Sequence, residues 1–189
     1  MKLKKTHLMP LTLTGIIILL DQVSKAIIAA FWPILSYRDD GRVVPRFIAN
    51  VIGDDFLQII HVRNRAIAFS LGDNLPDIIK PVLFIVLPLL VLGILLWYYL
   101  KSNDFTRFQR WVVAGILGGG IGNLIDRIFR TDGVVDFIDF KFYGIFGFDR
   151  WPTFNVADAS VVVCCILLLV SIIITSISSS KKQKKKVHK

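Results

Sequence analysis

Four apolar stretches, each long enough to cross a membrane, constrain this chain more than any other feature of its sequence. A helix needs about 20 predominantly apolar residues to span the hydrocarbon core of a bilayer. A soluble protein of 189 residues would bury one core rather than four separate apolar runs. The sequence therefore predicts an all-α membrane protein, a bundle of four transmembrane helices at approximately residues 8–31, 78–100, 108–128 and 154–177.

Lysine and arginine residues predict how these helices are oriented. They gather in the first five residues, in residues 101–110 and in the tail 181–189. Loops rich in Lys and Arg tend to remain on the cytoplasmic side of a membrane. We therefore expect the N- and C-termini to be cytoplasmic and the two other loops, residues 33–77 and 127–150, to lie on the outer side.

The first outer loop is expected to contain a small extracytoplasmic β-element. Residues 42–69 mix β-branched and aromatic side chains around a turn signal at 53–55, which predicts two or three short strands resting on the outer membrane surface. Residues 1–180 are expected to form a single membrane-embedded domain. The basic tail 181–189 is expected to orient the protein and attract anionic lipid rather than nucleic acid.

Polar residues interrupt three of the four apolar stretches near their outer ends. A rise of about 1.5 Å per residue places Asp21 about 20 Å above the inner face, with Lys25 one turn further out on the same side. Polar side chains inside a membrane usually face a protein interior or a cavity. Their shared depth predicts a functional site. The residues are Asp21 and Lys25 on the first helix, Asn123, Asp126 and Arg127 on the third, and Asn155 and Asp158 on the fourth.

The second outer loop offers Asp158 a partner carboxylate. Its segment GVVDFIDF carries apolar residues that would hold it against the membrane surface, which returns Asp136 or Asp139 to the mouth of the bundle. Two carboxylates in a poorly hydrated site cannot both ionise cheaply, so they share a proton. One can then activate a water while the other donates a proton to a carbonyl oxygen. The spacing does not decide between Asp136 and Asp139, and a salt bridge or a helix cap is the ordinary alternative for each.

Other chemistries lack the residues they require. His7, His61 and His188 fall on different faces or tails, and the chain has no Glu to complete a zinc site. The glycine-rich run 118–122 lies inside a membrane helix instead of following a strand, which argues against a phosphate-binding loop. We therefore expect no metal and no organic cofactor.

Five motifs run in order along the chain: DQVSK (21–25), NRAIAF (64–69), GGGIGNLIDR (118–127), GVVDF (133–137) and FNVAD (154–158). Together they resemble the lipoprotein signal peptidase family, also called signal peptidase II. Members are aspartic peptidases of the bacterial cytoplasmic (inner) membrane that remove signal peptides from lipid-modified prolipoproteins. The resemblance covers nearly the whole chain except the basic tail. One position departs from it, because the family usually has Gly where this chain has Ala66.

The resemblance implies a function and a set of site residues. The protein would be an aspartic endopeptidase that cleaves diacylglyceryl-modified prolipoproteins just before the lipidated cysteine, at the outer-leaflet surface. Its partners would be these substrates and membrane phospholipids, and it would act as a monomer. The implied catalytic pair is Asp136 and Asp158, the supporting polar residues are Asn123, Asp126, Arg127 and Asn155, and the substrate- or lipid-binding residues are Asp21, Lys25 and Asn64.

Two other functions are compatible with the polar cluster. A small proton-coupled transporter would use several of its carboxylates as a proton path, but it would place ionisable residues across the full membrane depth, whereas the inner halves of all four stretches are apolar. A non-catalytic lipid-binding assembly factor would hold head groups with the same charges. A peptidase is distinguished from both by Asp136 and Asp158 lying close enough to act on one water.

Overall fold

The computed structural model describes the backbone of residues 5–34, 36–37, 43–44, 48–64, 76 and 78–187. It describes the side chains within residues 7–34, 48–64, 76 and 78–178.

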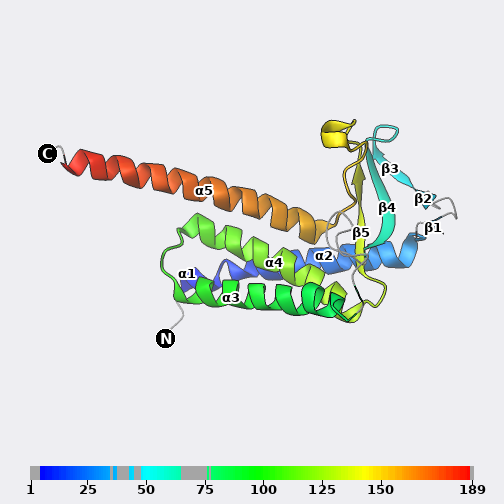
Figure 1. Ribbon diagram of the computed structural model, residues 1–189, viewed down its shortest axis with the longest axis horizontal. Coiled ribbons are helices and arrows are strands. Elements are labelled where there is room, and N and C mark those ends of the chain that lie inside the picture. Colours follow the sequence, from blue (N-terminus) through cyan, green and yellow to red (C-terminus); the bar gives the residue numbers. More distant parts are fainter. Residues whose placement is uncertain are drawn as a thin grey trace.

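Among the described residues, four helices are long and apolar enough to cross a membrane, as the sequence predicts. They run side by side, and the β-strands gather at one end of them (Figure 1). A short helix, α1 (Lys5–Leu8), precedes the first span. The second span opens with a π-helical turn, η2 (Val82–Val86). Pro88 follows this turn, and a proline has no backbone N–H to donate to a regular helical turn. The spans are Leu11–Phe31 (α2), Val82–Lys101 (η2 and then α3, Leu87–Lys101), Arg107–Phe129 (α4) and Val156–Ser178, the first part of α5 (Val156–Val187).

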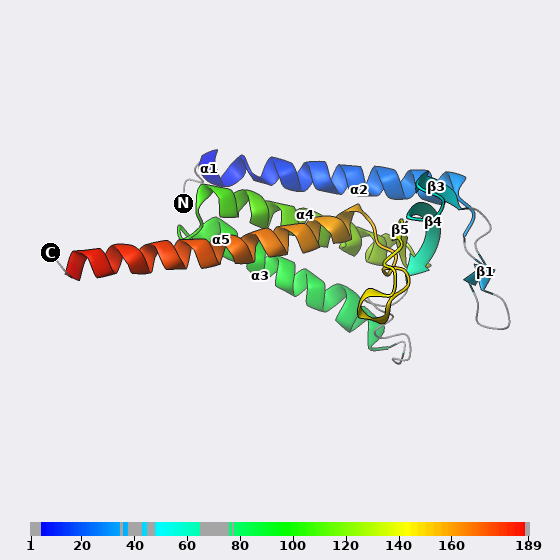
Figure 2. The ribbon, with the colours of Figure 1, turned by 90° about the horizontal axis from the view of Figure 1, so that it is seen from above.

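The helix α4 is the centre of the bundle. It contacts α2, α3 and α5, and it lies between α2 and α3 when the molecule is seen from above (Figure 2). Over the 18-residue apolar stretch of each span, 56% of the residues are buried in α4, against 22% in α2 and 0% in α5. The outward faces of the other helices therefore remain available to lipid, while α4 supplies the internal contacts.

Close helix packing depends on glycines in α4. A Cβ atom at Gly118 would lie 2.9 Å from the Ile17 Cβ of α2, which is shorter than real side chains tolerate. A Cβ at Gly119 would overlap the carbonyl oxygen of Ala157 in α5. Small residues let membrane helices approach at backbone distance, where van der Waals contact and interhelical hydrogen bonds stabilise them. The glycine-rich run is thus a packing surface.

A three-stranded antiparallel sheet covers one end of the bundle. Its order is β3-β4-β5, formed by Ala49–Ile52, Leu57–Asn64 and Val134–Phe140. A separate pair, β1 (Ser36–Tyr37) and β2 (Val43–Val44), lies nearby in the chain. The predicted strands of the first outer loop are present. The third strand, β5, comes from the second outer loop, where the sequence analysis placed none.

The strand β5 is held on both sides. It pairs with β4 along one edge, and on the other edge the N–H groups of Phe137 and Ile138 donate to the carbonyl of Phe154, just before α5. Val135 and Phe137 pack against Ile28 of α2 in a small buried core. Successive side chains of a strand point to opposite faces. Asp136 therefore points away from this core, on the face opposite Val135 and Phe137.

The glycine contacts predict a stability difference between two single substitutions. Gly119→Ala should destabilise the protein, because overpacking a tight contact costs about 1–3 kcal/mol. Gly93→Ala in α3 is the matched control, since a Cβ there meets no described atom within 4 Å. Thermal unfolding of the two purified variants in detergent measures the difference. Equal midpoints would contradict the packing role of Gly119.

Candidate active site

Asp158 is oriented by the start of α5. The Asn155 side-chain oxygen Oδ1 accepts from the backbone N–H of Asp158 at 2.9 Å, and Asp158 Oδ2 accepts from the backbone N–H of Asn155 at 3.2 Å. This reciprocal arrangement is the geometry of a capping box, with Asn and Asp in the two capping positions. The motif FNVAD is thus a helix start, and it fixes the Asp158 carboxylate at the end of the bundle next to β5.

Two asparagine amides connect Asp158 to Asp136. Asn123 donates from Nδ2 to Asp158 Oδ1 at 2.7 Å. Asn155 donates from Nδ2 to Asp136 Oδ1 at 2.7 Å and to Asn123 Oδ1 at 3.1 Å. On the other side, Asn64 of β4 donates from Nδ2 to Asp136 Oδ2 at 3.0 Å. The structure therefore brings Asp136, and not Asp139, into one hydrogen-bonded network with Asp158.

Asp139 lies outside this network. Its Oδ2 forms an ion pair with Arg150 Nε at 2.7 Å. Asp136 and Asp139 are three positions apart on one strand, so their side chains leave it on opposite faces. Of the two carboxylates that the spacing left open, Asp136 is thus the one that lies in the network of Asp158.

Burial makes Asp136 a weak acid. Its side chain is 2% exposed, and this burial, together with the nearby charge of Asp158, raises the pKa of Asp136 to about 7. The hydrogen bonds from Asn64 and Asn155 and the charge of Lys25 act in the opposite direction. Near neutral pH, Asp136 is therefore divided between its protonated and ionised forms, as a shared-proton carboxylate pair requires.

Lys25 is an internal cation. Its Nζ lies 2.8 Å from Asp21 Oδ2 and 3.1 Å from Asp126 Oδ2, and it donates to Asn123 Oδ1 at 2.9 Å. An ammonium group has three donors, and these three acceptors account for all of them. The Lys25, Asp21 and Asp126 side chains are each 0% exposed. In this structure Asp21 and Lys25 therefore brace the helices from inside the bundle, and their predicted contact with a lipid head group stays a prediction.

The same cluster ties α5 and β5 to the bundle. Asp21 Oδ1 accepts from the Ala157 N–H at 3.0 Å, which satisfies one free amide at the start of α5. Asp126 Oδ2 accepts from the Val135 N–H of β5 at 3.2 Å. Both carboxylates therefore fix the backbone next to a proposed catalytic residue.

Two residues that the sequence did not mark as site residues, Gln22 and Arg130, also contact Asp126. Gln22 donates from Nε2 to Asp126 Oδ1 at 3.1 Å, and Arg130 Nε lies 3.1 Å from the same oxygen. The spacing of Arg130, four positions after Asp126, was an available signal, because residues at i and i+4 are neighbours on a helix. The predicted site residue Arg127 has its guanidinium 5.0 Å from the ring centre of Phe84 in η2, in cation–π geometry.

Two sequence-based expectations, on Ala66 and on metal ions, stay predictions. Ala66 and the rest of the NRAIAF motif after Asn64 lie outside the described residues. Within the part of the chain that the structure describes, no group of three or more His, Cys, Asp or Glu side chains is arranged to hold a metal ion.

The four spans and the buried carboxylate pair are the arrangement expected of one class, that of membrane-embedded hydrolases of the aspartic type. Residues 13–174 match the family described as signal peptidase (SPase) II. The chain belongs to the signal peptidase II family. It is therefore a peptidase of the bacterial inner membrane.

Individual relatives agree with this family. The chain is 48% identical over 159 residues to the lipoprotein signal peptidase of Treponema denticola, which covers 84% of this chain and 85% of that protein. It is 41% identical over 161 residues to the lipoprotein signal peptidase of Treponema pallidum, with 85% and 81% covered. A bacterial membrane enzyme solved by the in meso method at 2.3 Å resolution is 28% identical, with a TM-score of 0.70 and 89% of each chain covered.

The pKa of Asp136 predicts how stability depends on pH. A carboxyl group whose folded pKa is about 7 contributes its full stabilisation below its unfolded pKa and loses it as pH rises to about 7. The thermal midpoint of the native protein should therefore fall between about pH 4 and pH 7. In Asp136→Asn this part of the fall should be absent. Parallel pH profiles of the two proteins would contradict the raised pKa.

The buried cation predicts a loss of stability. Lys25→Met should destabilise the protein by about 3–5 kcal/mol, because it leaves Asp21 and Asp126 without their shared partner. Lys101→Met is the control, since Lys101 is exposed at the end of α3. Yield and thermal midpoint in detergent are the measurements. A Lys25→Met protein of native stability that needs more substrate for half-maximal rate would contradict the bracing role and favour the lipid contact.

Proposed function

We propose that Asp136 and Asp158 catalyse hydrolysis of one peptide bond in a lipid-modified prolipoprotein, just before the lipidated cysteine. The observation that carries the proposal is the hydrogen-bonded connection of the two carboxylates through Asn123 and Asn155. A buried carboxylate with a pKa of about 7 beside a second one is the acid–base pair that this chemistry needs.

The reaction follows from the two protonation states of the pair. The ionised carboxylate accepts a proton from a water, whose oxygen attacks the carbonyl carbon of the scissile bond. The protonated carboxylate donates its proton to the carbonyl oxygen, giving a neutral tetrahedral gem-diol. When the C–N bond breaks, the carboxyl group that took the proton of the water donates it to the leaving nitrogen. The ionised partner takes the proton of one gem-diol hydroxyl, and the new carboxyl group is released. The enzyme ends with one proton shared by the pair, as at the start.

The supporting residues have separate tasks in this proposal. Asn64, Asn123 and Asn155 hold the carboxylate oxygens through hydrogen bonds, which fixes the direction in which the remaining lone pairs point. The Asp21–Lys25–Asp126 cluster braces the elements that carry them. A single chain supplies both carboxylates, so we propose that a monomer is the active form.

The location of the pair suits a lipid-anchored substrate. Asp158 lies in the first turn of α5, where the membrane span begins, and Asp136 lies on the sheet next to it. We propose that this end faces the extracytoplasmic side, because the basic segments lie at the opposite ends of the helices. A diacylglyceryl group in the outer leaflet then places the bond before the modified cysteine near the two carboxylates.

Isosteric substitutions test the catalytic pair. Asp136→Asn and Asp158→Asn should each abolish cleavage of a lipidated prolipoprotein by the purified enzyme, because an amide cannot accept the proton of the water. Asp139→Asn is the matched control on the same strand and should retain cleavage within about tenfold, since Asp139 contacts Arg150 instead.

Thermal unfolding checks that each variant remains folded. Substantial cleavage by a folded Asp136→Asn or Asp158→Asn enzyme would remove that residue from the mechanism. Loss of cleavage in Asp139→Asn alone would move the catalytic role to Asp139.

A further inference from the structure

A loop rich in aromatic residues projects from the sheet and takes no part in the proposed chemistry. We call residues 142–149, which follow β5 and contain the short helix η3 (Ile145–Gly147), the aromatic loop. Phe146 is 85% exposed and Tyr143 is 65% exposed. Large apolar side chains gathered on a surface mark an interaction site. The exposed apolar residues of the loop are Tyr143, Ile145, Phe146 and Phe148.

Backbone pairing closes this loop at its base. Lys141 and Arg150 form a β-bridge, and the Phe142 N–H donates to the Asp149 carbonyl at 2.7 Å. Below the loop, the ring of Trp151 stacks on Phe140 and meets Phe142 edge-on, with ring centres 6.1 and 5.0 Å away. The exposed rings are therefore presented from a packed aromatic base.

Polar contacts fix the loop to the turn between β3 and β4. Lys141 Nζ lies 2.6 Å from Asp55 Oδ2, and Arg150 donates from a guanidinium nitrogen to the Asp55 carbonyl at 3.0 Å. The ring of Tyr143 stacks on Phe56 of the same turn, 6.3 Å between centres. These contacts hold the loop in place relative to the sheet and thus to Asp136.

The backbone of the loop also has an unfavourable conformation at two residues. Tyr143 and Phe146 have φ values of +54° and +53°, in the left-handed region that aromatic side chains rarely adopt. Such conformations persist where surrounding contacts over-determine them, and they are found at functional positions. Phe146 is thereby presented outward at the tip, while Tyr143 lies against Phe56.

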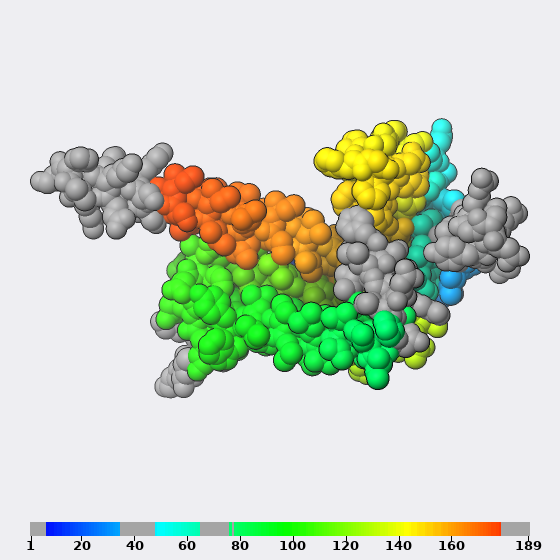
Figure 3. Space-filling view, viewed as in Figure 1, coloured from blue at the N-terminus to red at the C-terminus, as the bar shows by residue number. Residues whose placement is uncertain are grey.

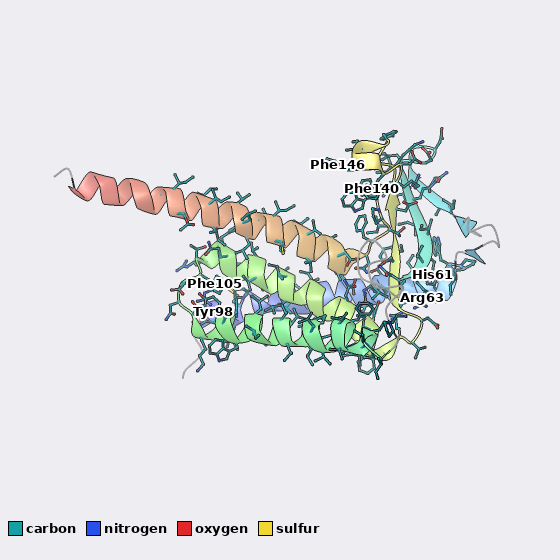
Figure 4. All side chains as sticks on the ribbon, viewed as in Figure 1. His61, Arg63, Tyr98, Phe105, Phe140 and Phe146 are labelled. Atoms are coloured by element: carbon teal, nitrogen blue, oxygen red, sulfur yellow. The ribbon has the colours of Figure 1, made fainter. Side chains whose placement is uncertain are left out.

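The loop lies at the level where the membrane spans begin. Figure 1 shows it level with the start of α5 along the bundle, displaced sideways and on the side of the sheet from which the helices extend. In Figure 3 the loop stands out from the surface near the first turns of α5, and Figure 4 marks Phe146 within it. The outward side chains of those α5 turns, Val162, Val163 and Ile166, are exposed and apolar, so they face lipid.

We propose that the aromatic loop inserts its exposed side chains into the interfacial layer of the bilayer, beside the lipid-facing surface of α5. Aromatic rings concentrate at this layer, where the head groups meet the hydrocarbon. The bilayer itself is the partner, because the loop lies at the same level as the exposed apolar surface of the first turns of α5. The anchor would set the height and tilt of the sheet, and hence of Asp136, above the membrane.

Fluorescence quenching in liposomes tests the anchor. The two cysteines of the chain are first replaced in Cys164→Ala/Cys165→Ala, and Phe146→Cys then carries a polarity-sensitive fluorophore. Asp54→Cys is the matched control, because Asp54 is exposed on the neighbouring β3–β4 turn. The liposomes contain phosphatidylethanolamine and phosphatidylglycerol, and the quenchers are nitroxide-labelled lipid and aqueous iodide.

The proposal predicts opposite responses at the two labels. Nitroxide lipid should quench the label at 146 several-fold more than the label at 54, and iodide should quench it several-fold less. A label at Ile145→Cys should respond in the same way without altering a residue of positive φ. Iodide quenching as strong at 146 as at 54 would overturn the proposal.

Binding of the loop to another partner would give a different result. Protection from iodide that disappears on dilution of the protein in lipid would overturn the proposal in favour of a second copy of the chain. Protection that appears only after adding a lipidated substrate would overturn it in favour of a substrate contact. The predicted quenching is measured before any substrate is added, so it succeeds or fails independently of the proposed peptidase function, and Asp158→Asn protein should give the same quenching.

Discussion

The buried ammonium group of Lys25 is the contact on which the rest of this structure depends. A cation at partial membrane depth is costly unless it is fully paired. Asp21 and Asp126 lie within 2.8 and 3.1 Å of it, and the two carboxylates also accept backbone N–H groups from α5 and β5. One ion cluster therefore joins the helices α2, α4 and α5 and the strand β5. Removing the cation would leave the buried carboxylates of Asp21 and Asp126 without their shared partner.

The proposed catalytic arrangement follows from this cluster. Lys25 donates to the carbonyl oxygen of the Asn123 side chain, so the amide nitrogen of Asn123 turns toward Asp158. The Asn155 amide links the same oxygen to Asp136. The positive charge also opposes the rise in the pKa of Asp136 that burial and Asp158 cause. Packing and amide orientation at the site thus share one physical origin in the interior of the bundle, whereas burial and Asp158 cause the raised pKa of Asp136.

Local patterns in the sequence predicted the helices but only part of the site. Apolar length gave the four spans, and the i, i+4 spacing gave the Asp21–Lys25 pair. The burial of Lys25 was not predictable, because its partner Asn123 lies 98 positions away. The strand β5 was missed for the same reason, since a seven-residue strand is stabilised by pairing with β4 and Phe154 rather than by local preference. The family resemblance selected Asp136 over Asp139, a choice that spacing alone left open.

The central claim is that Asp136 and Asp158 act as one coupled acid–base pair. Infrared titration of the carboxyl bands of isotope-labelled aspartate, with Asp136→Asn used to assign the band, tests it most directly. The account predicts that Asp136 titrates at about pH 7 in the native protein. In Asp158→Asn its pKa should fall, because the neighbouring charge is gone, yet remain above the ordinary range because burial persists. Titration of Asp136 near its ordinary pKa of about 4, unchanged by Asp158→Asn, would contradict the claim.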